Sequence, residues 1–323
     1  MPNTLYPYTT ILMKKLFCLF ISLAAVYASF AQTYKNEIGI QTDNDSYLGQ
    51  GSDRYYTDGI YVYFRHALKI KDGDTKLKNK VLGFEVGQKI YNPQSGDVPS
   101  VAYVDRPYAG YLYAGSTLNL LYANESNLKL GMQVGVIGPG SGAQGVQTTV
   151  HSWFGFYPPT GWERQIHDGA QLNLSAEYNR LLGRDDDVDA TFNSYANLGN
   201  GFSGAGAGFM FRAGTINHLY KSVSTQSTVS RSAAAPHEFF AYYKPAINYV
   251  AYDATIQGSL FNKTVYPQQI TLDKNPFIFS NQIGGAITAN HFVFDISVIF
   301  HTHEVKEMVT SEQWGSVTGF YRF

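Results

Sequence analysis

The segment Leu128-Lys-Leu-Gly-Met-Gln-Val-Gly-Val136 alternates without a break between apolar residues and polar or glycine residues. Every even position is apolar, and every odd position is Lys, Gly or Gln. Successive side chains of a β-strand point to opposite faces, so this period of two predicts a strand with one apolar and one polar face. Long strands of this kind are typical of transmembrane β-barrels, in which the apolar face meets lipid and the other face lines a polar lumen.

The same alternation recurs along the chain, as in residues 171–178 and 292–300. Further candidate strands are Tyr34–Thr42, Tyr56–His66, Val81–Tyr91, Tyr108–Tyr122, Val188–Leu198, Phe202–Ala213, Glu238–Tyr249, Tyr252–Leu260, Thr264–Leu272, Phe277–Ile287 and Trp314–Phe323. Some of these runs can merge or belong to loops, so we expect about twelve strands. The predicted fold is all-β: an antiparallel transmembrane β-barrel with long extracellular loops and a short loop helix. A soluble β-sandwich also alternates, but its strands are usually shorter.

The composition agrees with a membrane barrel. Charged residues make up 15% of the chain and aromatic residues another 15%, whereas about a quarter of an average soluble protein is charged. The formal net charge is −1, and there is no Lys/Arg stripe. Nucleic acid is therefore not an expected partner.

The N-terminus carries the features of a signal peptide. Met13-Lys14-Lys15 precedes the apolar run Leu16–Phe30, and small residues at Ser29 and Ala31 suit a cleavage site. We expect translation to start at Met13, a signal peptide over residues 1–31, and one barrel domain over residues 32–323. A membrane anchor helix is the alternative, but the run is short for it. The single cysteine, Cys18, lies in this segment, so the mature chain would have no disulfide and no thiolate site.

Strand order predicts where the polar motifs meet. If the N-terminus lies in the periplasm, strands 34–42, 81–91 and 128–137 all run outward, and the loops that follow them share the extracellular rim. Those loops hold Asp43-Asn44-Asp45, Asp105-Arg106 and His151. By parity Asp43, Asp45 and Thr57 point inward, whereas Asn44 points the other way unless the strand ends or bulges there.

One histidine stands out because of its surroundings. A Gly/Pro turn at Gly138 follows strand 128–137, and Val146, Val150 and Trp153 then recur at helical spacing. His151 lies on this predicted helix. Histidine exchanges a proton near neutral pH, so it is a candidate general base, although a lone loop histidine often has no catalytic role.

Together these motifs resemble the lipid A 3′-O-deacylase family of outer-membrane barrels, the LpxR-like proteins. The resemblance rests on Asp43-Asn-Asp45, Asp53-Arg-Tyr-Tyr-Thr-Asp-Gly59, Ile90-Tyr-Asn-Pro93, Asp105-Arg-Pro-Tyr-Ala-Gly110 and Ile137-Gly-Pro-Gly-x-Gly-x-Gln-x-Val-Gln-x-x-x-His151. It implies a twelve-stranded barrel in the bacterial outer membrane. It also implies Ca²⁺-dependent hydrolysis that releases the 3′-acyloxyacyl group from lipid A, the lipopolysaccharide anchor of the outer leaflet. We expect the protein to be a monomer.

The resemblance also implies roles for single residues. His151 matches the family's catalytic histidine, which activates water for attack on the ester. Asn44 and Asp45 match a pair at the metal and catalytic centre, and Thr57 matches a threonine of the same site. Asp45 and Asn44 are therefore the candidate ligands of Ca²⁺, a hard cation that prefers oxygen ligands.

Two positions depart from the family pattern. A lysine found in some members falls near Val98 here, and a glutamate six residues after the histidine falls on Tyr157. Arg106 and Glu163 are the alternative sources of these charges, although Asp105-Arg106 also suits an ion pair that braces a loop. Two alternative functions follow: a barrel that binds or transports lipid or solute without catalysis, and a phospholipase-type esterase on the same scaffold.

Overall fold

The computed structural model describes residues 33–49, 53–232, 237–262, 264 and 266–323. The predicted signal peptide and the start at Met13 lie outside the described residues. Within the described part of the chain, helices that combine the length and the apolar character needed to cross a membrane do not occur.

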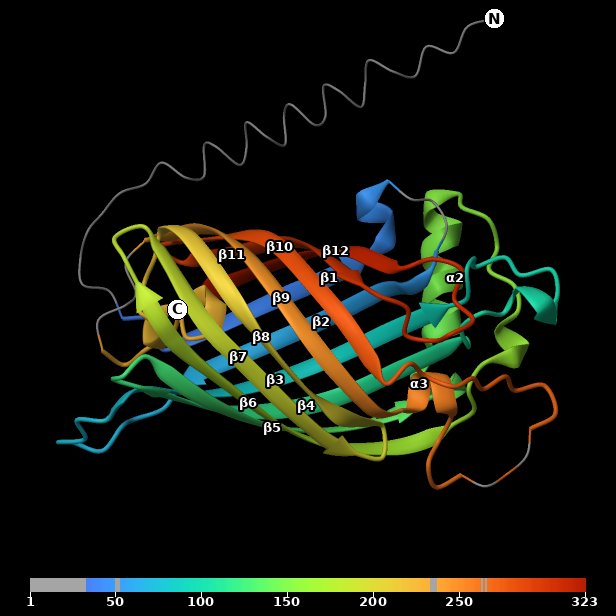
Figure 1. Cartoon of the computed structure of the whole chain (residues 1–323), viewed down its shortest axis with the longest axis horizontal. Helices are drawn as coiled ribbons and strands as arrows, with labels where there is room; N and C mark the ends of the chain where they lie inside the picture. The colour runs from blue at the N-terminus through green and yellow to red at the C-terminus, as the bar shows by residue number, and fades with distance from the viewer. Residues whose placement is uncertain (1–32, 50–52, 233–236, 263, 265) are drawn as a thin grey trace, which may run out of the picture. The chain divides into compact units, whose positions relative to one another are not determined.

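Twelve antiparallel strands form a closed barrel, as the sequence predicts (Figure 1). The strands are β1 (Asn36–Asn44), β2 (Tyr55–Ala67), β3 (Leu77–Asn92), β4 (Ala109–Tyr122), β5 (Ser126–Ile137), β6 (Gly169–Arg184), β7 (Val188–Gly199), β8 (Phe202–Thr215), β9 (Glu238–Asp253), β10 (Phe277–Ala289), β11 (Phe292–His301) and β12 (Glu312–Arg322). Each strand pairs with its neighbours in sequence, and β12 returns to pair with β1. The closing register runs from Glu37 opposite Arg322 to Asn44 opposite Gly315.

Two of the candidate strands are not strands. In Tyr252–Leu260, strand β9 ends at Asp253, whose side chain accepts a hydrogen bond of 2.8 Å from the Thr255 amide. This bond caps the short helix α3 (Ala254–Gln257), whose apolar residues are buried in the loop rather than turned to lipid. In Thr264–Leu272, the described residues form no strand. Ile256, Ile270 and Leu272 of these runs pack in apolar clusters of the loops, which local alternation does not distinguish from a strand.

The two faces of the strands are as parity predicts. On β5, Met132 is 47% exposed on the outer surface, between the exposed side chains of Leu130 and Val134. The next residue, Gln133, turns into the lumen and donates a 2.8 Å hydrogen bond to Glu85. The outer face is therefore apolar and the lumen is polar and internally bonded, as a barrel in lipid requires.

The long connection between β8 and β9 lies across the end of the barrel where β1 starts and β12 ends. It contains the short helices η5 (Leu219–Lys221) and η6 (Val223–Thr225). Side chains from strands on the other side of the barrel bond to its backbone: Asn79 to Val229, Asn119 to Thr225 and Arg322 to Thr228, at 2.8–3.0 Å. The described residues of this connection thus cover this end of the barrel.

The opposite end carries the remaining helices (Figure 1). They are η1 (Asp45–Leu48), η2 (Val101–Tyr103), η3 (Pro139–Ser141), α2 (Ala143–Phe154), η4 (Trp162–Arg164) and α3. The loops after β1, β3 and β5 therefore meet at one rim, as strand order predicts, and the predicted loop helix is α2.

The assignment of faces predicts that the same substitution has a large effect on stability at Met132 and a small effect at the neighbouring Gln133. Met132→Lys places a charge toward hydrocarbon and should lower the free energy of unfolding by about 2–4 kcal/mol. Gln133→Lys, its matched control, turns into the lumen near Glu85 and should change stability far less. Urea unfolding in lipid vesicles measures both. Equal losses for the two variants would contradict the assignment.

Candidate functional site

Helix α2 turns a polar face toward the barrel. Its buried residues are Ala143, Gln147 and His151, which follow one another at intervals of four. The large apolar residues at its end, Trp153 and Phe154, are 77% and 68% exposed. Trp153, one of the apolar residues whose spacing predicted this helix, therefore lies on its exposed side. The burial of a glutamine and a histidine marks this face of α2 as a candidate site.

Both ring nitrogens of His151 have a defined neighbour. Nδ1 lies 2.7 Å from the carbonyl oxygen of Tyr157. A carbonyl oxygen only accepts, so Nδ1 carries a proton and donates it. Nε2 lies 3.2 Å from Oδ2 of Asp53, and the Tyr157 hydroxyl donates a hydrogen bond to the same oxygen. Tyr157 therefore holds the ring and the carboxylate together.

Asp45 and Thr57 are in direct contact. Asp45 is buried at the start of η1, where its carboxylate accepts hydrogen bonds from the Arg54 amide at 2.8 Å and from the Thr57 hydroxyl at 3.3 Å. Both residues come from the segments that the sequence singled out, and parity correctly turned both inward.

Asn44 joins the same group through a different neighbour. It is the last residue of β1 and caps η1, with its side-chain oxygen 2.7 Å from the Ser46 amide. It lies opposite Asp58 in the β1–β2 register, and its side-chain amide donates a hydrogen bond to the Asp58 carboxylate. The strand end, not a bulge, gives Asn44 this position.

Three carboxylates, Asp45, Asp53 and Asp58, lie close enough to influence one another. Burial, together with the smaller effect of the charges of Asp53 and Asp58, raises the pKa of Asp45 to about 8. In the described part of the chain, the contact between Asp53 and His151 is the only ion pair that these three groups make. The carboxylates of Asp45 and Asp58 therefore offer oxygen ligands to a cation.

Asn92 adds a further oxygen that the sequence analysis did not select. It is fully buried at the end of β3, and neither its side-chain oxygen nor its nitrogen has a hydrogen-bond partner among the described residues. A Cβ added to Gly96 would lie 3.2 Å from Asp53 Oδ2 and 3.3 Å from Asn92 Nδ2, so these two side chains flank Gly96. An unpaired buried amide is costly, and a bound ligand would satisfy it.

Arg106 and Glu163 each form an ion pair with a residue other than His151. Arg106 is buried and pairs with Glu304 at 2.9 Å, as a loop brace would. Glu163 is exposed and pairs with its neighbour Arg164. Val98 packs in an apolar cluster with Tyr108 and Trp162. The carboxylate beside the histidine is Asp53, whose signal was its place in the Asp-Arg-Tyr-Tyr-Thr-Asp motif.

Gln147 is another residue that sequence reasoning missed. It lies one turn before His151, on the same buried face of α2. The Trp162 indole donates a 2.9 Å hydrogen bond to its side-chain oxygen, and its Nε2 has no partner among the described residues. The fixed amide therefore presents a free hydrogen-bond donor on the face that carries the histidine.

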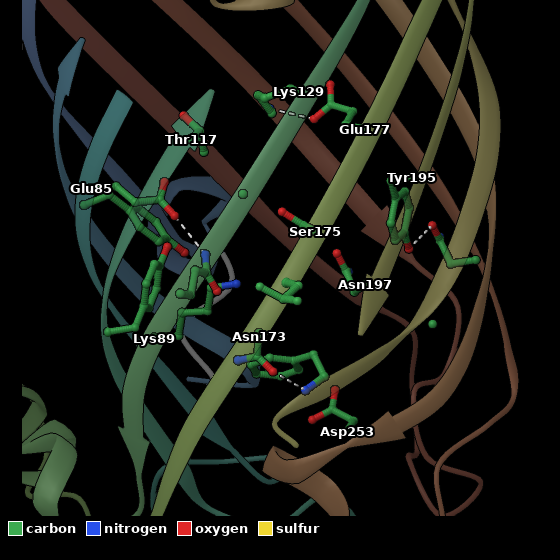
Figure 2. A pocket seen from close by; sticks show the side chains of 18 of the residues that line it. Glu85, Lys89, Thr117, Lys129, Asn173, Ser175, Glu177, Tyr195, Asn197 and Asp253 are labelled. Atoms are coloured by element: carbon green, nitrogen blue, oxygen red, sulfur yellow. Dashed lines mark hydrogen bonds and ion pairs between the residues drawn. The ribbon is translucent and has the colours of Figure 1, made fainter. Parts of the chain in front are cut away.

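A separate cavity of about 710 Å³ occupies the lumen (Figure 2). Polar side chains line it, among them Asn173 and Tyr195, and Lys129 and Glu177 form an ion pair of 2.6 Å there. His151, Asp45, Asn44 and Thr57 do not belong to this lining. The predicted site residues thus gather at the rim, outside the large cavity.

The comparisons with known proteins agree on one family. A family model described as "Outer membrane protein LpxR" matches residues 16–323. The solved structure of LpxR from Salmonella typhimurium is 20% identical, with a TM-score of 0.72, over 89% of this chain and 100% of that chain.

Other solved barrels are less similar. The β domain of the Bordetella autotransporter Brka is 9% identical with a TM-score of 0.46, over 90% of this chain and 99% of that one. The translocator domain of the Neisseria meningitidis autotransporter NalP is 11% identical with a TM-score of 0.41, over 100% of both chains. Likeness at this level carries no argument beyond the barrel. No curated protein matches the sequence.

The contact between Tyr157 and Asp53 predicts a specific loss of stability. Tyr157→Phe removes the hydroxyl that donates to the Asp53 carboxylate, and hydrogen bonds to charged groups contribute about 1.5–3 kcal/mol. The free energy of unfolding in detergent should fall by an amount of that order. Tyr103→Phe, at an exposed tyrosine, is the control and should change little. The same value for both variants would remove the role assigned to the Tyr157 hydroxyl.

Proposed function

The chain belongs to the LpxR family of outer membrane proteins, and on this premise we propose that it is a lipid A 3′-O-deacylase. The observation that carries the proposal is the buried face of α2, where His151 meets Asp53 and Tyr157 at the rim. The residues are a proton acceptor, a carboxylate and hydrogen-bond donors, the groups that ester hydrolysis needs.

The position of the site suits a lipid substrate. The barrel lies in the bacterial outer membrane, and its extracellular rim stands beside the outer leaflet. Trp153, Phe154 and Phe156 leave large apolar surfaces exposed next to the site. Acyl chains favour contact with such surfaces, so these residues would guide the substrate ester toward His151.

In the proposed reaction His151 acts as general base. Its Nδ1 is held by the Tyr157 carbonyl, so the proton must be accepted at Nε2. A water molecule beside Nε2 gives its proton to that nitrogen and attacks the ester carbonyl, while Asp53 stays next to the ring. When the tetrahedral intermediate collapses, the C–O bond breaks and the proton passes to the leaving 3′ oxygen. The products are a free acyloxyacyl carboxylic acid and a 3′-hydroxyl on lipid A.

Neighbouring groups would support this cycle. The negative charge of Asp53 favours the imidazolium that forms when Nε2 is protonated. Burial and the charge of Asp53 raise the pKa of Tyr157 well above its usual value, so its hydroxyl stays protonated and keeps Asp53 in place. The free amide donor of Gln147 is suited to stabilise developing negative charge on the carbonyl oxygen.

We propose that Ca²⁺ binds at the carboxylate cluster. Asp45 and Asn44 are the ligands that the resemblance implies, and Asp58 and the unpaired oxygen of Asn92 extend the set. Four oxygen-bearing side chains fit a hard divalent ion. When bound, such an ion would polarise the ester carbonyl as a Lewis acid.

A binding or transport barrel is the second candidate, because the polar lumen cavity could hold a solute. The β8–β9 connection counts against passage, since it is bonded to strands across the end of the barrel. A phospholipase-type esterase would use the same histidine on a different lipid. The products of hydrolysis distinguish these candidates.

His151→Ala and Asp53→Asn should each lower the rate of lipid A deacylation, because they remove the base and the charge beside it. We expect losses of roughly 10²-fold or more, the usual contribution of a general base. His167→Ala is the matched control, since this rim histidine stacks on Tyr266 away from the site. The assay is mass spectrometry of lipid A after incubation with purified protein, with Ca²⁺ or with chelator.

Each outcome of this assay has a consequence. Unchanged acylation with Ca²⁺ present would overturn the deacylase, and release of fatty acid from phospholipid alone would favour the phospholipase. A His151→Ala protein as active as the parent would remove the proposed base. Equal activity with Ca²⁺ and with chelator would contradict the proposed requirement for Ca²⁺.

The raised pKa of Asp45 predicts how Ca²⁺ affinity depends on pH. Below about pH 8 this carboxyl is protonated in the metal-free protein, so Ca²⁺ must displace a proton to bind. The affinity should therefore rise roughly tenfold per pH unit toward pH 8 and level off above it. Isothermal titration calorimetry in detergent measures this, and Asp45→Asn should abolish the slope. A flat profile in the parent protein would exclude Asp45 as a ligand.

A further inference from the structure

A second cluster of ligand-type side chains lies where β11 and β12 meet the extracellular rim. His301 is the last residue of β11, Glu312 is the first residue of β12 and lies opposite it in the register, and Glu304 belongs to the loop between them. One ligand atom from each lies within 4.8 Å of the other two. All three residues line the lumen cavity, which the candidate catalytic residues do not.

We propose that His301, Glu304 and Glu312 form a binding site for a divalent transition-metal ion such as Zn²⁺. Each carboxylate is held by one oxygen and offers the other. Glu304 Oε2 accepts from the Arg106 guanidinium at 2.9 Å, and Glu312 Oε1 accepts from the Tyr56 amide at 2.6 Å. Because Glu304 Oε2 and Glu312 Oε1 are fixed by these bonds, the other oxygen of each carboxylate is oriented to bind a metal.

Two of the three atoms that would bind the metal have no hydrogen-bond partner among the described residues. Glu312 is 1% exposed, and its Oε2 has no hydrogen-bond partner among the described residues. The Nδ1 atom of His301 is likewise buried and unpaired. Buried polar atoms without partners are costly, so two of them aimed at one point indicate a missing ligand.

The spacing fits a metal better than a direct hydrogen bond. His301 Nδ1 lies 3.8 Å from Glu304 Oε1 and 3.6 Å from Glu312 Oε2. A hydrogen bond would need about 2.7–3.2 Å. Two ligands at about 2.1 Å from a tetrahedral ion are roughly 3.4 Å apart, so a small contraction would close the site around Zn²⁺.

The ligand set and the local charge select the kind of ion. An imidazole nitrogen suits Zn²⁺ and similar metals, whereas Ca²⁺ prefers oxygen alone. Arg106 offsets one carboxylate, but Asp253 lines the same cavity, so negative charge remains in excess. Three protein ligands leave a fourth position open to the lumen cavity. This site is independent of the proposed deacylase chemistry.

The experiment counts metal ions on the full-length protein, purified in detergent without a polyhistidine tag and stripped with EDTA. Equilibrium dialysis against ZnCl₂ in excess Ca²⁺, which occupies any oxygen-only site, is followed by elemental analysis. The variants are His301→Ala and Glu312→Gln. Glu304 is left intact because its loss would leave Arg106 buried and unpaired. Glu85→Gln, at a lumen glutamate bonded to Gln133, is the matched control.

The parent protein and Glu85→Gln should each retain one Zn²⁺ that both ligand variants lose. The parent should also unfold at a higher temperature with Zn²⁺ than without it, and this shift should vanish in the ligand variants. Heat-modifiable migration on gels confirms that each variant is a folded barrel. Absence of Zn²⁺ from the parent, or equal Zn²⁺ in all folded variants, would overturn the proposal. Displacement of Zn²⁺ by the excess Ca²⁺ would do the same.

Discussion

The closure of β1 on β12 is the constraint on which the rest of this structure depends. Hydrocarbon offers no water to backbone N–H and C=O groups, so a sheet in the membrane must satisfy them internally and have no open edge. Once the sheet closes, alternate side chains must face lipid and lumen along every strand. Because successive strands are antiparallel, the loops after β1, β3 and β5 all lie at one rim. The candidate site is therefore assembled by topology before any of its side chains makes a contact.

Much of the barrel fold was predictable from the sequence because it rests on local periodicity. The alternation in Leu128–Val136 defines the lipid face directly, and counting strands places Asp45 and His151 at the same end although they are far apart in the chain. Parity also turned Asp45 and Thr57 inward, where they are in contact. It erred at Tyr252–Leu260, because a helix cap at Asp253 looks like continued alternation when only local spacing is considered.

The residues that contact the His151 ring could not be predicted from periodicity. Aligning the family pattern at a fixed offset from His151 points to Tyr157, but the carboxylate at the ring comes from Asp53, 104 residues away from that tyrosine. Which loop delivers the acid is decided by long-range packing at the rim, not by spacing along α2. Tyr157 takes part nevertheless, since its carbonyl fixes the ring and its hydroxyl fixes the acid.

Helix α2 departs at the candidate site from the usual rule that apolar side chains are buried and polar side chains are exposed. A helix packed for stability alone would bury Trp153 and expose Gln147, because burial of apolar surface is favourable and burial of polar groups is costly. Here the polar face is inside and the tryptophan is outside. The cost is offset in part by defined partners, Trp162 for Gln147 and Asp53 for His151. Among the described residues, the Gln147 amide nitrogen and the Asn92 side chain remain unpaired, and both lie where the proposed substrate or ion would bind. Part of the cost of burying polar groups is thus located at the candidate site, where binding would relieve it.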